Sequence, residues 1–398
     1  MLGLVRKGSI IQRILKVLRL LAMLAGCALL PNAAWGQSSP DLPVEDELPI
    51  VLLVDISSGQ VLFSRNSERR FAPASMAKVM TLFHAFELMK EGSLNPRQYL
   101  TMSEKVWREW NGQGSTMWIN AGDEVPVSDL LTGIANISAN DAAIMLAEEH
   151  AGSVRNWLDG MNSRARELGM TQSYFGTPNG WPDDGYTFTT AENLVLLATA
   201  LIRSHPQSYA QYVGQPGFSY NSVTQVNHDP LIGVIDGADG IKTGYTNEAG
   251  FGYLGSAERA GQRLVLVLGG ARRYDTRIEA SRDLIEWGFG AFDRQRLYGA
   301  GEIVGKARVQ AGNRRSIDLQ TDSAVSINVP RQGTGELRAS IQYDGPLIAP
   351  LAQGEEVATL VIEVPGMGPA RVPLYATQSV EDSGFMDRIF NGFAGWFS

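Results

Sequence analysis

The chain has 398 residues, of which 44% are hydrophobic, and its formal charge is −8 at pH 7. This length is enough for two domains. The acidic balance gives no electrostatic basis for binding nucleic acid, and no glycine-rich loop in the required strand–helix context suggests a nucleotide cofactor.

Residues 1–36 predict a cleavable secretion signal. They contain five basic residues and no acidic ones, and their apolar core, residues 20–30, is too short to span a bilayer. The small residues of Ala34-Trp35-Gly36 suit cleavage before Gln37. Residues 37–48 are polar and contain proline, which is typical of a linker.

The only cysteine, Cys27, lies within the predicted signal. The segment Leu24-Ala25-Gly26-Cys27 is similar to a lipoprotein cleavage box, but apolar residues continue beyond it and an ordinary cleavage site follows. We therefore expect ordinary cleavage. The mature chain then has no thiol, which excludes disulfides and cysteine catalysis.

The segment Phe71–Thr81 follows a predicted β-hairpin formed by residues 49–54 and 59–64. It places Ser75 and Lys78 three residues apart at the start of a predicted buried helix, so that both side chains lie on one face. A lysine whose pKa is lowered by burial can take the proton of a serine hydroxyl. The pair is a candidate nucleophile and base, although the pattern alone also fits a helix N-cap followed by a surface lysine.

Residues 127–152 predict two short helices that meet at Ser138-Ala139-Asn140. The polar side chains at this junction either face a cleft or cap the second helix. A tryptophan-rich stretch before it, residues 107–118, is expected either to form a surface loop beside a cleft or to serve structural packing alone. Further helices are expected at 155–169, 191–204 and 277–292, and a turn-rich loop at 171–190.

A second chemically suggestive stretch is Lys242-Thr243-Gly244, which precedes two predicted strands at 251–257 and 263–270. Gly244 suits the close approach of a ligand to a strand backbone. Lys242 is either part of a charged site or a solvated lysine that protects an edge strand from aggregation.

From about Tyr298 the helical periodicity stops, and short alternating runs separated by Gly and Pro predict a small β-rich domain. The last residues, 385–398, differ again. At 100° per residue their apolar side chains fall within an arc of about 140°, namely Phe385, Met386, Ile389, Phe390, Phe393, Trp396 and Phe397. Such a helix can lie in a membrane interface or dock on a protein surface, and we expect the membrane.

The three motifs, in this order after a secretion signal, resemble those of the serine acyl-transferases that react with penicillin. The flanking residues FAPASMAKVMT, SANDA, KTGYTNEAG and EWGF are most similar to the low-molecular-mass penicillin-binding proteins, the D-alanyl-D-alanine carboxypeptidases. The resemblance is detailed over residues 45–292. It implies an α+β fold: a penicillin-binding, β-lactamase-like domain with an antiparallel sheet and helices at 49–297, an all-β domain at 298–378, and a C-terminal amphipathic anchor at 383–398.

The resemblance also implies roles for individual residues. Ser75 would attack the carbonyl between two terminal D-alanines, Lys78 would accept its proton, and Ser138 would relay a proton to the leaving amine. Asn140 would hold the acyl chain or Lys78. The substrate's terminal carboxylate would be bound by Lys242, Thr243 and Arg277, beside Gly244, and the backbone N–H groups of Ser75 and Tyr245 would form the oxyanion hole.

No cofactor is expected, and the four histidines show no metal-ligand spacing. The expected partners are a peptidoglycan stem peptide, β-lactams as covalent inhibitors, and a membrane surface contacted by residues 385–398. The implied location is the periplasm, at the outer face of the bacterial inner membrane. Two features depart from the usual pattern: Tyr245 stands where many relatives have histidine, and the middle triplet is Ser-Ala-Asn rather than Ser-Gly-Asn.

Three alternatives remain at this point. A β-lactamase of the class A type would carry a glutamate in the loop 171–190, which has only Asp183 and Asp184. An endopeptidase that cuts peptide cross-links would have identical motifs. A wall-binding module with a vestigial site is disfavoured because every expected polar group is present.

Overall fold

The computed structural model describes residues 48–331 and 336–382. The predicted secretion signal, Cys27 and linker residues 37–47 lie outside these ranges, and so does the predicted amphipathic helix at 383–398. Within the described ranges, no helix is both long and apolar enough to cross a membrane.

The first part of the chain is built on a five-stranded antiparallel sheet with the order β2-β1-β9-β8-β7. Its strands are β1 (Ile50–Asp55), β2 (Gln60–Arg65), β7 (Ala238–Thr246), β8 (Gly250–Arg259) and β9 (Gln262–Ala271). The central strand β9 has a continuous buried apolar run, as expected for a strand covered on both faces. In contrast, β7 is an edge strand and leaves one side of its backbone unpaired within the sheet.

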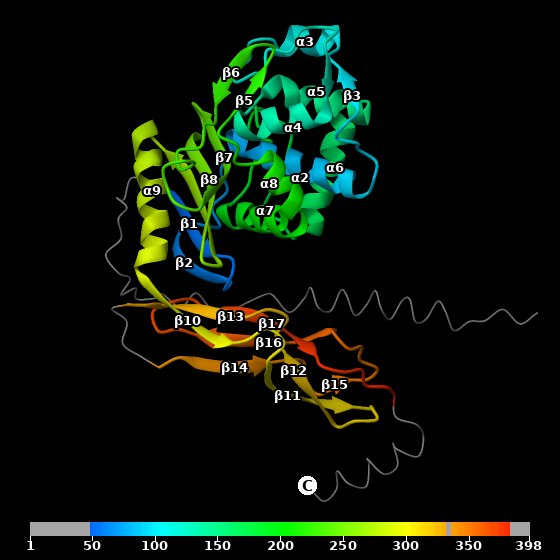
Figure 1. The fold of residues 1–398 in the computed structure, drawn as a ribbon, viewed down its shortest axis with the longest axis vertical. Helices are drawn as coiled ribbons and strands as arrows, with labels where there is room; N and C mark the ends of the chain where they lie inside the picture. The colour runs from blue at the N-terminus through cyan, green and yellow to red at the C-terminus, as the bar shows by residue number, and fades with distance from the viewer. Residues whose placement is uncertain (1–47, 332–335, 383–398) are drawn as a thin grey trace, which may run out of the picture. The chain divides into compact units, whose positions relative to one another are not determined.

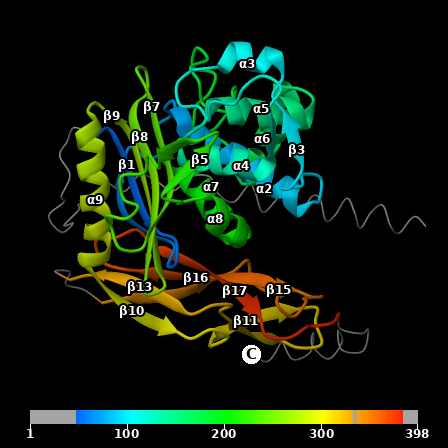
Figure 2. The same cartoon turned by 45° about the horizontal axis from the view of Figure 1, so that its top comes forward.

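Helices cover both faces of this sheet (Figures 1 and 2). One face is covered by α9 (Tyr274–Gly290), which contacts β8, β9 and β1. The other carries the larger helical group, in which α7 contacts β1 and β9. The helices of this group are α2 (Lys78–Lys90), α3 (Glu104–Trp110), α4 (Val127–Asn136), α5 (Asn140–Ala151), α6 (Val154–Glu167), α7 (Ala191–Ser204) and α8 (Pro206–Tyr212).

The long helices agree with their sequence periodicity, whereas several short elements were not predicted. The tryptophan-rich stretch begins within α3, for which Ser103 is the N-cap because its hydroxyl accepts a hydrogen bond from the Val106 N–H. Two small two-stranded sheets are also absent from the predicted elements, β3 (Tyr99–Thr101) with β4 (Glu124–Pro126), and the hairpin of β5 (Gly217–Tyr220) with β6 (Val223–Val226). Elements this short carry too few residues for a periodic pattern to emerge.

The second part of the chain is all β and begins earlier than expected, at Phe292 rather than at residue 298. Phe292 had been assigned to the preceding helix, but α9 ends at Gly290 and β10 (Phe292–Tyr298) pairs with β13 (Val325–Pro330). A six-stranded sheet follows, with the order β14-β16-β17-β12-β11-β15. Its strands are β11 (Ile303–Gln310), β12 (Ser316–Gln320), β14 (Arg338–Gln342), β15 (Leu347–Ile348), β16 (Glu356–Glu363) and β17 (Ala370–Ala376). The predicted α+β domain followed by an all-β domain is confirmed.

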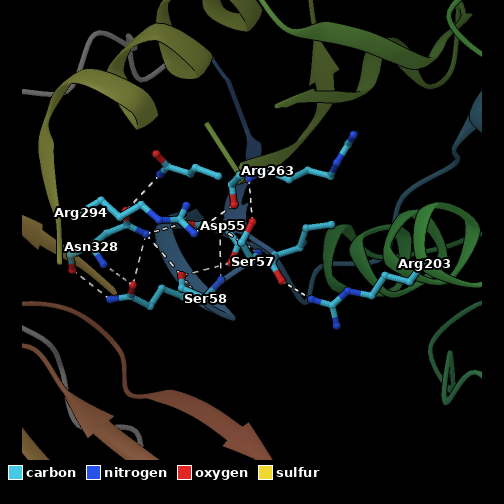
Figure 3. A network of polar contacts seen from close by, with 11 residues as sticks. Asp55, Ser57, Ser58, Arg203, Arg263, Arg294 and Asn328 are labelled. Atoms are coloured by element: carbon cyan, nitrogen blue, oxygen red, sulfur yellow. Dashed lines mark hydrogen bonds and ion pairs between the residues drawn. The ribbon is translucent and has the colours of Figure 1, made fainter. Parts of the chain in front are cut away.

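A buried polar network joins the two parts at the turn between β1 and β2 (Figure 3). Asn328 of β13 donates from Nδ2 to Asp55 Oδ2 at 2.6 Å, and its backbone exchanges hydrogen bonds with the Gln60 amide. Arg294 of β10 lies 3.7 Å from Asp55 Oδ2. Because Asp55 and Asn328 are almost fully buried, each would be costly to leave without its partner.

Candidate active site

Ser75 lies in a single 3₁₀ turn, Ala74–Ala77, that leads directly into α2. The expected first α-helical turn is therefore a tighter one, because Ala74 has a positive φ of 48° and the Met76 N–H donates to the Pro73 carbonyl. Lys78 is the first residue of α2 and is fully buried, whereas Ser75 remains partly exposed. The turn thus presents the hydroxyl to solvent and keeps the amine behind it.

The Lys78 amine is held by three oxygen atoms. Its Nζ lies 3.0 Å from Ser75 Oγ, 2.7 Å from Asn140 Oδ1 and 2.7 Å from the backbone carbonyl oxygen of Asn179. A neutral amine has two hydrogens and one lone pair. The amide oxygen and the carbonyl can only accept, so they take the two hydrogens, and the lone pair is left facing the Ser75 hydroxyl.

The surroundings of Lys78 favour this neutral form. Burial lowers the pKa of Lys78 well below its usual value, the charge of Lys242 lowers it further, and Asp141 acts in the opposite direction. Asp141 is itself buried and accepts hydrogen bonds from the backbone N–H groups of Met117, Ile119 and Ala142. Its main contact is therefore with the wall of the site rather than with the lysine.

The junction between α4 and α5 positions Ser138 and Asn140 opposite Ser75. Ser138 has a left-handed backbone with φ of 62° and is 4% exposed, an unusual combination for a non-glycine residue. The Asn140 N–H donates to the Ser115 carbonyl at 2.7 Å, and its Nδ2 donates to the Gln113 carbonyl at 2.8 Å. These bonds orient the Asn140 side chain so that its oxygen points at Lys78, and neither polar group serves as a helix N-cap.

The edge strand β7 supplies Lys242, Thr243, Gly244 and Tyr245. Lys242 is 2% exposed, which excludes the solvated edge lysine considered from the sequence. A Cβ on Gly244 would lie 2.6 Å from the Pro73 carbonyl oxygen, so only glycine allows β7 to pack against the Ser75 turn. Tyr245 is half exposed, stacks on Phe251 at 4.2 Å, and donates its hydroxyl hydrogen to Asn247 Oδ1.

A set of charges surrounds Lys242. The pKa of Lys242 is lowered to about 7, mainly by burial; Asp229 acts to raise it and Arg277 acts to lower it. Burial also raises the pKa of Asp229 to about 6, although its carboxylate accepts hydrogen bonds from the Tyr253 hydroxyl at 3.1 Å and the Leu231 N–H at 2.8 Å. His228 is kept neutral near pH 7, because burial together with these cations lowers its pKa to about 4.

One cavity of about 720 Å³ unites the predicted residues. Ser75, Ser138, Asn140, Thr243, Gly244, Tyr245 and Arg277 line it, and Lys78 and Lys242 lie buried behind this lining. All nine predicted site residues therefore meet in one place. The cavity also contains residues that the sequence reasoning did not single out as functional: Asn179, Trp181, His228 and Asp229.

Gly180 explains how the loop 171–190 approaches Ser75 so closely. It has φ of +72°, and a Cβ there would lie 1.9 Å from the Ala74 carbonyl oxygen. The loop thus packs directly on the nucleophile turn and brings the Asn179 carbonyl to Lys78. Within residues 48–331 and 336–382, no group of three or more His, Cys, Asp or Glu side chains is arranged to hold a metal ion.

Comparison with known families gives two matches that together span most of the chain. The profile described as D-alanyl-D-alanine carboxypeptidase matches residues 44–273. The profile described as penicillin-binding protein 5, C-terminal domain, matches residues 292–382. The second match begins at the first residue of β10.

Individual relatives agree with these profiles. The D-alanyl-D-alanine carboxypeptidase DacC of Escherichia coli is 32% identical over 391 residues, which cover 94% of this chain and 97% of the relative. The crystal structure of penicillin-binding protein 5 from Haemophilus influenzae superposes with a TM-score of 0.75 at 29% identity, covering 86% of this chain and all of that one. An ampicillin-bound penicillin-binding protein D2 from Listeria monocytogenes, 28% identical with a TM-score of 0.56, covers 63% of this chain and 99% of its own.

Proposed function

The chain belongs to the D-alanyl-D-alanine carboxypeptidase family, and on this premise we propose that it removes the terminal D-alanine of peptidoglycan pentapeptides through an acyl-enzyme on Ser75. The observation that carries the proposal is the 3.0 Å separation of Lys78 Nζ from Ser75 Oγ. A serine hydroxyl that faces the lone pair of a buried amine with a lowered pKa is an activated nucleophile, and the amine is its base.

Acylation requires the hydroxyl proton to leave as the new bond forms. Ser75 Oγ attacks the carbonyl carbon of the penultimate D-alanine while its proton passes to Lys78 Nζ. The carbonyl oxygen becomes an oxyanion, for which the backbone N–H groups of Ser75 and Tyr245 are the proposed donors. Collapse of this intermediate breaks the peptide bond, and the proton reaches the leaving nitrogen of D-alanine through the Ser138 hydroxyl.

The substrate's terminal carboxylate fits the cationic end of the cavity. Arg277 and Lys242 would supply positive charge, and the hydroxyl of Thr243, which lines the cavity, would donate a hydrogen bond. Deacylation repeats these steps with water as the nucleophile and Ser75 as the leaving group. The water molecule attacks the ester carbonyl, Lys78 takes its proton, and Ser75 regains a proton as the shortened peptide leaves. β-Lactams would acylate the same hydroxyl.

The proposal is tested with the purified protein, a synthetic pentapeptide and a fluorescent penicillin. We expect mass spectrometry to show the loss of one alanine from the peptide and covalent labelling of the wild type. Both signals should disappear in Ser75→Ala and persist in Ser93→Ala, an exposed serine outside the cavity. Persistent labelling of Ser75→Ala would refute the assignment. Cleavage of a cross-linked peptide dimer, without loss of alanine from the monomer, would instead indicate the endopeptidase.

We further propose that the protein acts in the periplasm, attached to the outer face of the inner membrane by residues 385–398. The support is sequence-based: a secretion signal and an apolar stripe of Phe, Ile, Met and Trp along the terminal segment. Deletion of residues 385–398 should move the protein from the membrane fraction to the periplasmic fraction. Unchanged fractionation, in a Cys27→Ser background that removes any lipid attachment, would refute this anchor.

A further inference from the structure

A second cavity of about 540 Å³ lies at the end of the sheet, next to the catalytic one. The turn between β7 and β8, the end of β9, the beginning of β1 and the segment 69–72 line it. Its charged residues are three arginines, Arg69, Arg70 and Arg272, against a single acid, Glu248. In a chain with a net charge of −8, this is a local excess of positive charge.

The arginines of this cavity are not neutralised by acids. Among the residues that the structure describes, the guanidinium groups of the exposed residues Arg69 and Arg272 have neither an ion pair nor a hydrogen bond. The Arg70 side chain is held in place by neutral groups, since it donates two hydrogen bonds to Gln172 Oε1 and lies over the Phe188 ring at 4.5 Å. A cavity that collects cations without counterions is suited to an anionic ligand.

The basic cavity adjoins the catalytic one at the end of β7. Tyr245 and Asn247 line both cavities. A small hollow lined by Ala72, Trp181, Thr246 and Glu248 shares residues with each of them. The path from Ser75 toward the arginines therefore follows the end of the strand on which Thr243 and Tyr245 lie.

The geometry of the proposed substrate determines what reaches this cavity. With the terminal carboxylate at Thr243 and Arg277, the acyl side of the peptide must run the other way, along the free edge of β7 as an added strand. Thr243 and Thr246 are separated by about 10 Å at roughly 3.3 Å per extended residue. The second and third residues of a pentapeptide bound in this way would therefore lie near Thr246 and Asn247, and Asn247 lines the basic cavity.

We propose that the cavity lined by Arg69, Arg70 and Arg272 binds the free carboxylates of these acyl-side residues of the stem peptide. The inference rests on the proposed carboxypeptidase function and extends it to substrate specificity. In a stem pentapeptide the second residue is a glutamate linked through its side chain, so its main-chain carboxylate is free. We assign this carboxylate to the arginines of the cavity.

The test compares two pentapeptides that differ only in this group, one with the free carboxylate and one with the carboxamide. The enzymes are wild type, Arg69→Ala/Arg272→Ala, and Arg97→Ala as a control that removes an exposed arginine outside the cavity. In the wild type we expect a lower KM for the carboxylate form. The double variant should raise the KM for that form about three- to tenfold, as for partly exposed ion pairs, and leave kcat unchanged.

Several outcomes separate this inference from the proposed function. If the wild type has the same KM for both peptides, or if the double variant changes both equally, the cavity does not bind the carboxylate and the inference is overturned, while the release of alanine still supports the carboxypeptidase. Loss of the wild-type preference in Arg97→Ala would also overturn it. If the wild type releases alanine from neither peptide, the proposed function itself fails.

Discussion

The charge of Lys242 predicts an alkaline limit to the activity. Because the pKa of Lys242 is lowered to about 7, the amine loses its charge above neutral pH, and the free enzyme loses a cation from its carboxylate pocket. The value of kcat/KM, which reports the free enzyme, should fall about tenfold for each pH unit well above 7. The lowered pKa of Lys78 affects the acidic limb of the pH profile, because this amine must be neutral to accept a proton.

The substitution Asp229→Asn tests how the Asp229 charge affects the pKa of Lys242. The amide keeps an oxygen that can accept from Tyr253 and Leu231, so the change removes charge with little change of shape. Since Asp229 raises the pKa of Lys242, its loss should move the alkaline limb down by about one pH unit, or ~1.4 kcal/mol. The variant should then be about fivefold slower than wild type at pH 7 and about tenfold slower at pH 8. Below about pH 6 the two should converge, because the pKa of Asp229 is raised to about 6 and the wild-type carboxyl is protonated there.

The assay is the release of D-alanine from a pentapeptide at low substrate concentration between pH 5 and 9. Lys242→Arg is the matched control, because a guanidinium stays charged over this range and should abolish the alkaline limb. A wild-type profile that is flat from pH 7 to 9, or a limb that Asp229→Asn does not move, would refute the link between the Lys242 charge and carboxylate binding.

Three further predictions concern other parts of the structure. Lys242→Ala should slow acylation by a fluorescent penicillin by orders of magnitude, and labelling at the wild-type rate would remove the lysine from the site. Gly180→Ala should slow the same reaction at least about tenfold, because its Cβ would overlap the Ala74 carbonyl. The matched control is Gly185→Ala, since Gly185 also has a positive φ but open space around it. This control should cost only about 1 kcal/mol of stability in a denaturant titration. Asn328→Ala should lower the free energy of unfolding by about 2–4 kcal/mol, because it leaves Asp55 and Gln60 short of partners in a buried network, and a change below 0.5 kcal/mol would contradict that reading.

The residues that the sequence identified lie close to one another within single helices or strands, so that their sequence spacing determines how near their side chains are. Ser75 and Lys78 are three residues apart, in the 3₁₀ turn and at the start of α2, so their spacing alone places the amine beside the hydroxyl. Lys242, Thr243 and Gly244 are consecutive on one strand. What joins these segments is tertiary packing, which was inferred from resemblance rather than from spacing.

The residues that were missed act through features that residue type does not reveal. Asn179 contacts Lys78 through its backbone carbonyl, an atom that every residue possesses. Asp229 lies on a connecting segment and is held at the site by hydrogen bonds from the Tyr253 hydroxyl of β8 and the Leu231 N–H. Likewise, β10 was not expected because its sequence is rich in charge and most of its side chains are exposed, so its strand character depends on pairing with β13.

The contact between Lys78 and the Asn179 carbonyl has a consequence for how this site can change. Replacing the Asn179 side chain leaves the carbonyl oxygen in the chain, so no single substitution deletes this acceptor directly. A resistance mutation that acts through this contact therefore has to change the backbone path of the loop. Such a change is costly at Gly180, because the loop packs there on the turn that carries the nucleophile. Inhibitor binding and the native reaction would then both depend on the backbone of this one loop.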